Sequence, residues 1–198
     1  MSKKIIFLGS SVTYGSAAGG VSFADIICAK SSFEMIKEAV SGTTLVDEDD
    51  SSYVSRLKRI DTDSADLFIC QLSTNDASLG KPLGEISEVF DKDSFDTKTV
   101  AGAIEYIIAY ARKNWGCPIA FYTGTKFDSK PYSDMVALLK EIAEKWGIVV
   151  IDLWNESSFN EVSQEDYARY MSDPIHPTLE GYKEWWGPYI EKYINEII

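Results

Sequence analysis

Short apolar runs alternate with longer amphipathic segments along this chain of 198 residues. A run of about four to eight apolar residues fits a strand buried on both faces of a parallel sheet. Apolar residues at helical spacing predict amphipathic helices instead. The runs predict strands at 5–8, 33–40, 65–72, 118–123 and 148–153. The helical spacing predicts helices at 22–29, 53–60, 97–114, 131–146, 161–170 and 178–198.

This alternation predicts an α/β fold, a three-layer αβα sandwich of flavodoxin-like type. We expect about five parallel strands joined by right-handed crossovers. The composition, 45% hydrophobic and 25% charged, suits one globular core, so we expect a single domain over 1–198. The segment 77–96 is irregular and is expected to form a long loop. Whether this loop covers a functional site is left open by the pattern.

The first strand ends abruptly in Gly9, Ser10 and Ser11. A strand, a turn and a helix in this order place small hydroxyl side chains at the carboxyl edge of a parallel sheet, where open α/β sheets bind their ligands. The N-terminus of the following helix offers unpaired N–H groups and the positive end of a dipole. A serine at this turn is therefore a candidate nucleophile, although phosphate binding or helix capping would use the same residue type.

The chain contains one histidine, His176, between Pro174 and Pro177. The simplest interpretation is a histidine in a surface loop without a function. However, the two prolines restrict the backbone around it, and Asp173 stands three residues earlier. A carboxylate at that spacing can orient one ring nitrogen and leave the other free to accept a proton from a hydroxyl. The order Ser…Asp…His is that of α/β hydrolases, but their G-x-S-x-G motif is absent because Thr13 occupies its last position.

Four short blocks in a fixed order resemble the SGNH hydrolase superfamily, the GDSL-like esterases. Residues 9–11 correspond to the family's Gly-Asp-Ser block, and Gly42 corresponds to the glycine of its second block. Residues 73–76 correspond to the Gly-x-Asn-Asp block, and residues 173–177 match Asp-x-x-His-Pro without departure. Each block alone is a weak signal, but together they cover nearly the whole chain.

The resemblance implies a role for each matched residue. Ser11 would be the nucleophile, His176 the proton carrier and Asp173 the residue that orients the imidazole. The N–H groups of Ser11 and Gly42 and the side-chain amide of Asn75 would form the oxyanion hole.

The sequence departs from the family pattern twice, because Ser10 replaces the usual aspartate and Ser73 the usual glycine. Two adjacent serines therefore compete for the role of nucleophile, and the alignment favours Ser11.

The family further implies a serine esterase that acts through an acyl-enzyme and needs no cofactor. A short-chain acyl ester or a carbohydrate O-acetyl group is the expected substrate, since no long exposed apolar segment suggests a lipid-binding lid. Tyr14 and Trp154 are candidates for lining an acyl or sugar pocket, with core packing as the alternative for Trp154. Asp76 is expected to hold its own loop rather than to take part in chemistry.

Charge and cysteine content narrow the possible partners. Nineteen basic against 31 acidic residues give a net charge of −12, which disfavours nucleic acid and anionic membrane surfaces. Three scattered cysteines and one histidine form no zinc set, and the acidic run 47–50 is expected to be a solvated loop, so we expect no metal. The absence of a signal-peptide core and of a membrane span predicts a cytoplasmic protein. The expected partner is a small ester substrate. The sequence leaves the oligomeric state open, with a homo-oligomer as one alternative.

A binding module is the rival hypothesis. Flavodoxin-like proteins hold a flavin phosphate on a hydroxyl-rich loop after the first strand, and residues 9–20 form such a loop in an acidic chain. That interpretation gives no task to Asp173, His176 or Asn75. Absence of yellow colour in the purified protein would dismiss this hypothesis.

Overall fold

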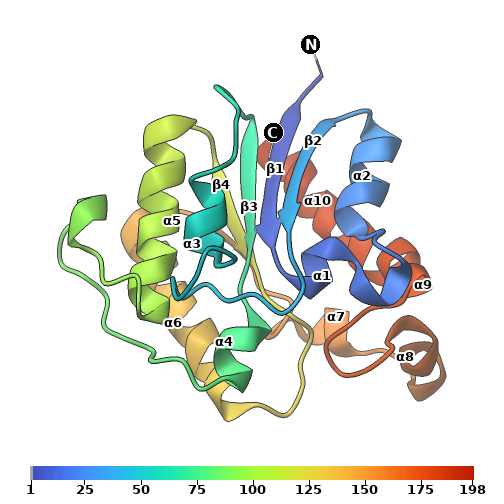
Figure 1. Ribbon diagram of the computed structural model, residues 1–198. Coiled ribbons are helices and arrows are strands. Elements are labelled where there is room, and N and C mark those ends of the chain that lie inside the picture. Colours follow the sequence, from blue (N-terminus) through green and yellow to red (C-terminus); the bar gives the residue numbers. More distant parts are fainter. Residues whose placement is uncertain (1) are drawn as a thin grey trace.

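The computed structural model describes residues 2–198 and shows a central sheet between two layers of helices (Figure 1). The strands are β1 (Lys4–Gly9), β2 (Glu34–Ala39), β3 (Leu67–Gln71), β4 (Ile119–Tyr122) and β5 (Val149–Ile151). The α-helices are α1 (Ser11–Tyr14), α2 (Phe23–Ser31), α3 (Tyr53–Leu57), α4 (Thr74–Ser78), α5 (Val100–Asn114), α6 (Lys130–Trp146), α7 (Ser157–Asn160), α8 (Gln164–Tyr170), α9 (Leu179–Gly181) and α10 (Gly187–Ile197). Short 3₁₀ turns form η1 (Ser16–Ala18) and η2 (Lys92–Ser94), and η3 (Tyr182–Trp186) is a π-helical turn.

The strands pair in parallel in the order β2-β1-β3-β4-β5. Ile5 of β1 stands opposite Met35 of β2 on one side and Leu67 of β3 on the other. The predicted α/β sandwich with a parallel sheet is therefore confirmed. The strand order reverses at β1, so the crevice beyond the carboxyl ends of β1 and β3 is the expected ligand site of such a sheet.

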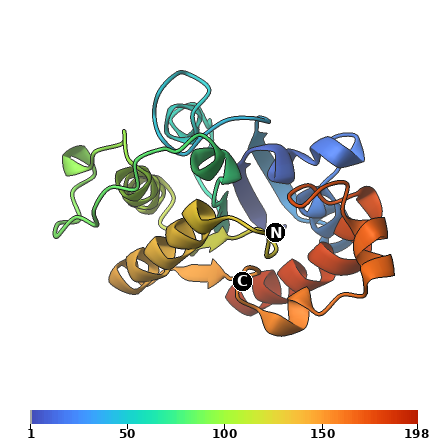
Figure 2. The same ribbon diagram turned by 90° about the horizontal axis from the view of Figure 1, so that it is seen from below.

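Each face of the sheet has its own apolar core, as expected for strands that are buried on both faces. On one face, α3, α5 and α6 pack on the sheet, with Leu57, Ile104 and Leu139 completely buried. On the other face, α2 and α10 do the same through Ile27 and Ile190. Figure 2 shows the two helical layers on either side of the strands.

Local signals in the sequence account for the ends of several helices. Ser22 and Asp25 form a capping box that begins α2, and Ser129 caps α6 just before Pro131 in its first turn. Gly147, in the left-handed conformation, ends α6.

The prediction of one continuous helix over 178–198 is wrong in detail. The segment is divided into α9, the π-helical turn η3 and α10. Pro188 has no N–H to donate and its ring crowds the preceding turn, while Gly187 N–H bonds to the carbonyl of Tyr182, five residues back. The expected loop over 9–20 likewise contains α1 and η1, and α4 was not predicted.

The irregular segment 77–96 begins in α4 at the carboxyl end of β3, and its residues 87–90 pack on the outer flank of the helical layer (Figure 1). Ser87 N–H donates to Glu105 of α5 at 2.8 Å, and the ring of Phe90 packs against Trp146 at the end of α6. Lys145 Nζ donates to the carbonyl of Val89 at 2.8 Å.

Between residues 2 and 198 no single helix has the length and apolarity to cross a membrane. The bent pair Ser11–Ala18 and Phe23–Ser31, angled at 94°, passes that test by length and composition only.

Candidate active site

The turn after β1 places Ser11 at the start of α1. A Cβ on Gly9 would lie 1.8 Å from Thr13 Oγ1, so this close turn requires glycine. The N–H of Ser11 belongs to the first turn of α1, where no carbonyl of the same helix can accept it. The result is a hydroxyl group, 6% exposed at the residue level, beside a backbone N–H without a helical partner.

A buried amide at the end of β3 holds this turn in place. Gln71 Oε1 accepts hydrogen bonds from the N–H of Ser10 at 2.9 Å and from the N–H and hydroxyl of Thr13 at 3.2 and 2.8 Å. The hydroxyl of Tyr122, at the end of β4, lies 2.6 Å from Thr13 Oγ1. The turn that carries Ser11 is thus tied to two neighbouring strands.

The loop that carries His176 is closed on itself. Met171 and Pro177 form an antiparallel bridge at its base. At its tip, Asp173 Oδ1 accepts hydrogen bonds from the N–H groups of Ile175 at 2.8 Å and His176 at 2.9 Å. One carboxylate oxygen therefore shapes the loop and leaves the other free for the imidazole ring.

Three side chains from the two ends of the chain form one hydrogen-bonded relay. Ser11 Oγ lies 2.8 Å from His176 Nε2, and His176 Nδ1 lies 2.7 Å from Asp173 Oδ2. With the proton on Nδ1, the imidazole donates to the carboxylate and accepts the serine O–H. Ser10, the competing serine, is completely buried, and its Oγ has no hydrogen-bond partner among residues 2–198.

The electrostatics of the relay favour an ionised carboxylate. Burial raises the pKa of the Asp173 carboxyl, but the hydrogen bonds from the His176 ring and from two backbone N–H groups outweigh this and lower the pKa below its usual value. An ionised Asp173 can stabilise an imidazolium next to it.

The second and third blocks lie together beside this relay. The side-chain amide of Asn75 donates to the carbonyl of Thr43 at 2.8 Å, so it lies next to the loop that contains Gly42. Gly42 has φ +82°, a left-handed conformation that favours glycine. An amide NH₂ group carries a second hydrogen, and Asn75 can direct this one at a ligand.

A buried arginine joins the two loops. Arg56 of α3 is 2% exposed, and its NH2 nitrogen donates to the carbonyl of Gly9 at 2.8 Å and to Thr43 Oγ1 at 3.0 Å. Its NH1 nitrogen donates to the carbonyl and carboxylate of Glu38 at 2.9 and 3.2 Å, and Nε donates to the carbonyl of Ser51 at 2.8 Å. Arg56 therefore sets the distance between the turn after β1 and the loop of Gly42.

Asp76 ties the third block to the second. Its carboxylate accepts the N–H groups of Leu45 at 2.8 Å and Val46 at 3.1 Å. Burial raises the pKa of the Asp76 carboxyl above its usual value, and this effect outweighs the lowering by its hydrogen bonds and by Lys81. The carboxylate of Asp76 thus holds the loop of Leu45 and Val46, rather than its own loop as expected from the sequence.

Sequence reasoning found the residues of the four blocks but missed Gln71 and Arg56. A visible signal existed for both: Gln71 is the polar end of an apolar strand, and Arg56 interrupts an apolar helical face. Of the two candidate pocket aromatics, Tyr14 is 44% exposed, and Trp154 is buried against Phe127.

The loop over 9–20, which the rival hypothesis assigns to phosphate binding, contacts a lysine instead. Lys37 Nζ donates to the carbonyls of Tyr14 at 3.3 Å and Gly20 at 2.9 Å, and to Asp25 Oδ2 at 2.6 Å. Carbonyls that converge on an ammonium group make a cation site, so this geometry does not favour an anion-binding loop. Across residues 2–198 there is no cluster of three or more His, Cys, Asp or Glu placed to hold a metal ion.

The fold and these side chains define the class, an α/β protein with a hydrogen-bonded serine, histidine and aspartate at the carboxyl edge of its parallel sheet. The chain belongs to the GDSL-like lipase/acylhydrolase family, whose model matches residues 7–184. This membership supports hydrolase activity. A comparison of the chain with curated proteins found no match.

Solved structures share the fold. A protein from Lactobacillus plantarum is 20% identical, with a TM-score of 0.82, and the match covers 100% of this chain and 99% of that one. A member of the lipolytic G-D-S-L family from Veillonella parvula is 16% identical, with a TM-score of 0.71 and coverage of 98% and 99%. A family two carbohydrate esterase from Clostridium thermocellum, solved with cellohexaose, is 15% identical, with a TM-score of 0.64. That match covers 98% of this chain and 65% of the esterase.

Proposed function

We propose that the protein is a serine esterase that cleaves carboxylic esters through an acyl-enzyme. The observation that carries the proposal is the relay from Ser11 Oγ through His176 to Asp173, with contacts of 2.8 and 2.7 Å. A nucleophile, a base and a group that orients the base, each within hydrogen-bond reach of the next, are what acyl transfer requires.

In acylation, Ser11 Oγ attacks the ester carbonyl carbon while its proton passes to His176 Nε2. The carbonyl π bond becomes an oxyanion, which the N–H groups of Ser11 and Gly42 and the amide of Asn75 stabilise. The imidazolium then protonates the alkoxide as the C–O bond breaks, and the alcohol leaves. Asp173 stays ionised throughout and stabilises the imidazolium.

In deacylation, water takes the place of the alcohol. His176 Nε2 accepts a proton from the water as its oxygen attacks the acyl carbon of the Ser11 ester. The same three donors hold the second oxyanion. Collapse of this intermediate returns the proton to Ser11 Oγ and releases the carboxylic acid.

The proposed substrate is a short-chain acyl ester or an O-acetylated carbohydrate. Support comes from the irregular segment 77–96, in which Ser87 and Phe90 pack on α5 and on the end of α6, away from the carboxyl edge of the sheet. Because the side chain of His176 is 27% exposed, the alcohol can be large and hydrophilic on that side.

The test compares two adjacent serines. Ser11→Ala should abolish hydrolysis of p-nitrophenyl acetate and labelling by a fluorophosphonate, and His176→Ala should abolish hydrolysis. Ser10→Ala is the matched control and should retain activity. If Ser11→Ala keeps full turnover while Ser10→Ala is inactive, the nucleophile is Ser10, and if neither variant loses activity the mechanism is wrong.

A further inference from the structure

The two segments that carry Ser11 and His176 are joined directly by few bonds. We call residues 10–15 the nucleophile turn and residues 171–182 the histidine segment. Across residues 2–198, two hydrogen bonds connect these segments. One is the 2.8 Å contact between Ser11 Oγ and His176 Nε2, which must break and re-form as the proton moves in the proposed reaction. The other bond takes no part in that chemistry, so it can keep the two segments at a constant distance.

This second bond runs from the hydroxyl of Tyr182 to the carbonyl of Val12, over 2.7 Å. Val12 directly follows Ser11 in α1, a helix of four residues, which is too short to supply N–H donors for its own carbonyls. Tyr182 is 1% exposed, and burial raises the pKa of its hydroxyl, so the group stays protonated and can donate. A buried neutral hydroxyl thus binds the residue next to the proposed nucleophile.

Backbone and side-chain bonds also hold Tyr182 to the side of the base. Thr178 Oγ1 accepts the N–H of Gly181 at 3.1 Å, and the Thr178 N–H donates to the carbonyl of Tyr170 at 2.8 Å. The N–H of Tyr182 donates to the Thr178 carbonyl at 3.0 Å. A Cβ on Gly181 would lie 2.2 Å from the Tyr170 carbonyl oxygen, so this close approach requires glycine. The stretch from His176 to Tyr182 is therefore braced along its length.

The π-helical turn η3 orients the Tyr182 ring. Tyr182, Trp186 and Ile190 are four residues apart, and all three are buried in the same apolar core. Residues four apart on an α-helix are rotated by about 40° relative to each other, and the wider turn of a π-helix reduces this rotation. A Cβ on Gly187 would lie 2.5 Å from the Tyr182 carbonyl oxygen, so the wide turn requires glycine. The turn lets Tyr182 face Val12 while Trp186 and Ile190 stay in the core.

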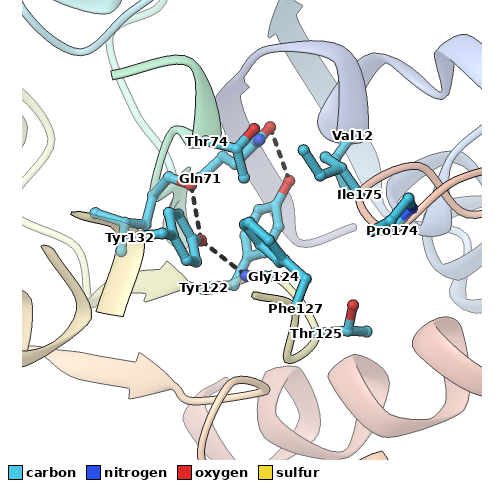
Figure 3. Close-up of a pocket in the computed structure, with 11 residues that line it drawn as sticks. Val12, Gln71, Thr74, Tyr122, Gly124, Thr125, Phe127, Tyr132, Pro174 and Ile175 are labelled. Carbon is cyan, nitrogen blue, oxygen red and sulfur yellow. Dashed lines mark hydrogen bonds between the residues drawn. The ribbon is translucent and has the colours of Figure 1, made fainter. Parts of the chain in front are cut away.

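Packing alone does not fix the distance between the two segments. Val12 of the nucleophile turn lies beside Ile175 of the histidine segment, and with Pro174 both line a small cavity (Figure 3). A contact that borders a cavity lacks part of the close packing that holds side chains in one position. The bond from Tyr182 therefore supplies a restraint that the apolar contacts do not.

We infer that Tyr182 is a positioning residue that sets the distance between Ser11 Oγ and His176 Nε2. The inference rests on the proposed esterase function. Because the Tyr182 hydroxyl is buried and bonded to a backbone carbonyl, it acts on the reaction only through that carbonyl. It holds Val12, and with it Ser11, at the distance that the imidazole requires.

The test is Tyr182→Phe, which removes the hydroxyl and keeps the buried ring. With p-nitrophenyl acetate, kcat should fall about 10–10²-fold, because misplacing a nucleophile by up to about 1 Å costs about that much in rate. KM should stay unchanged, because acylation and deacylation use the same relay and slow together. The rate constant for fluorophosphonate labelling of Ser11 should fall with kcat. Tyr193→Phe is the matched control, since the Tyr193 hydroxyl lies in α10, 3.5 Å from that of Tyr189, and it should leave both rates unchanged.

Two further variants separate positioning from core packing. Tyr182→4-aminophenylalanine restores an N–H donor on the same ring and should recover most of the lost kcat. Gly187→Ala keeps the Tyr182 hydroxyl but crowds the wide turn that orients it, so kcat should fall again while KM stays unchanged.

The outcomes distinguish this inference from the esterase proposal. A folded Tyr182→Phe protein with wild-type kcat and labelling rate overturns the positioning role and leaves the esterase intact. A loss of rate that 4-aminophenylalanine does not restore also overturns it, because the ring packing alone is then at fault. If Tyr182→Phe does not fold, a wild-type kcat in folded Gly187→Ala overturns the inference, and a lowered kcat supports it. A wild type that neither labels nor hydrolyses any ester overturns the esterase proposal, and the inference with it.

Discussion

Replacing Arg56 with methionine removes the cation that joins the turn after β1 to the loop of Gly42. Breaking a buried charged network costs about 3–5 kcal/mol of unfolding free energy. The lower end applies here, because the Gly9 carbonyl keeps the N–H of Val40 at 3.3 Å and the half-exposed Glu38 carboxylate can be hydrated. We therefore expect a loss of about 3 kcal/mol, with the protein still folded.

The same substitution should lower the rate of catalysis. Without Arg56, nothing joins Gly9 to Thr43 directly, and a displacement of about 1 Å between a nucleophile and its oxyanion donors costs about 10²-fold in rate. The loss should fall on kcat rather than KM, because Arg56 is buried beneath the site and is a positioning residue.

Urea unfolding and ester kinetics measure the two effects. A loss of about 3 kcal/mol corresponds to a shift of the urea midpoint by about 1–3 M. Arg59→Met, at an exposed arginine of the same segment, is the matched control and should change stability by less than about 0.5 kcal/mol. A wild-type midpoint and wild-type kcat in the Arg56→Met protein would refute the reasoning.

Three further predictions follow from the site. First, Asp173→Asn should lower kcat/KM about 10²–10⁴-fold, because the His176 imidazole then loses its carboxylate partner; a wild-type kcat/KM in this variant would remove Asp173 as the residue that orients the imidazole. The lowered pKa of Asp173 means that its contribution to stability is present above the unfolded value of about 3.9 and is lost as pH falls through the folded value. Secondly, the pKa of Asp76 is raised, so the folded state binds its proton more tightly, and the contribution of this group to the unfolding free energy falls as pH rises from about 3.9. In urea unfolding at a series of pH values, the unfolding free energy of Asp76→Asn should therefore fall less steeply with pH than that of the wild type. Equal slopes in the two proteins would contradict this prediction. Thirdly, Gly42→Ala meets no atom within 4 Å, so its cost is the left-handed conformation alone, about 1–2 kcal/mol in thermal unfolding, and an unchanged melting temperature would speak against that conformation.

Buried polar groups, more than the proposed relay itself, explain why the site has this shape. Gln71, Arg56 and Asp76 each bond to backbone atoms of a loop that carries a proposed site residue or lies next to one. Each also comes from a different element, β3, α3 or α4. The carboxyl edge of the sheet is thus held by side chains whose partners are distant in sequence.

The sequence by itself predicted the five strands of this protein, its longer helices and the residues of the four blocks, but not α4 or the division of the last helix. Buried strands appear as short apolar runs, and caps such as Ser22 and Gly147 act on neighbouring residues, so both depend on local interactions. The family resemblance pointed to Ser11 and His176, which the structure brings together across 165 positions.

Only the tertiary structure decided how these parts meet. The order β2-β1-β3-β4-β5, the choice of Ser11 over Ser10 as the partner of His176, and the place of 77–96 depend on contacts between distant segments. The roles of Gln71 and Arg56 depend on such contacts too, since their hydrogen-bond partners Ser10 and Gly9 lie 61 and 47 positions away. Local patterns record which residues are buried, but a buried polar group acquires its role from the partner that folding brings to it.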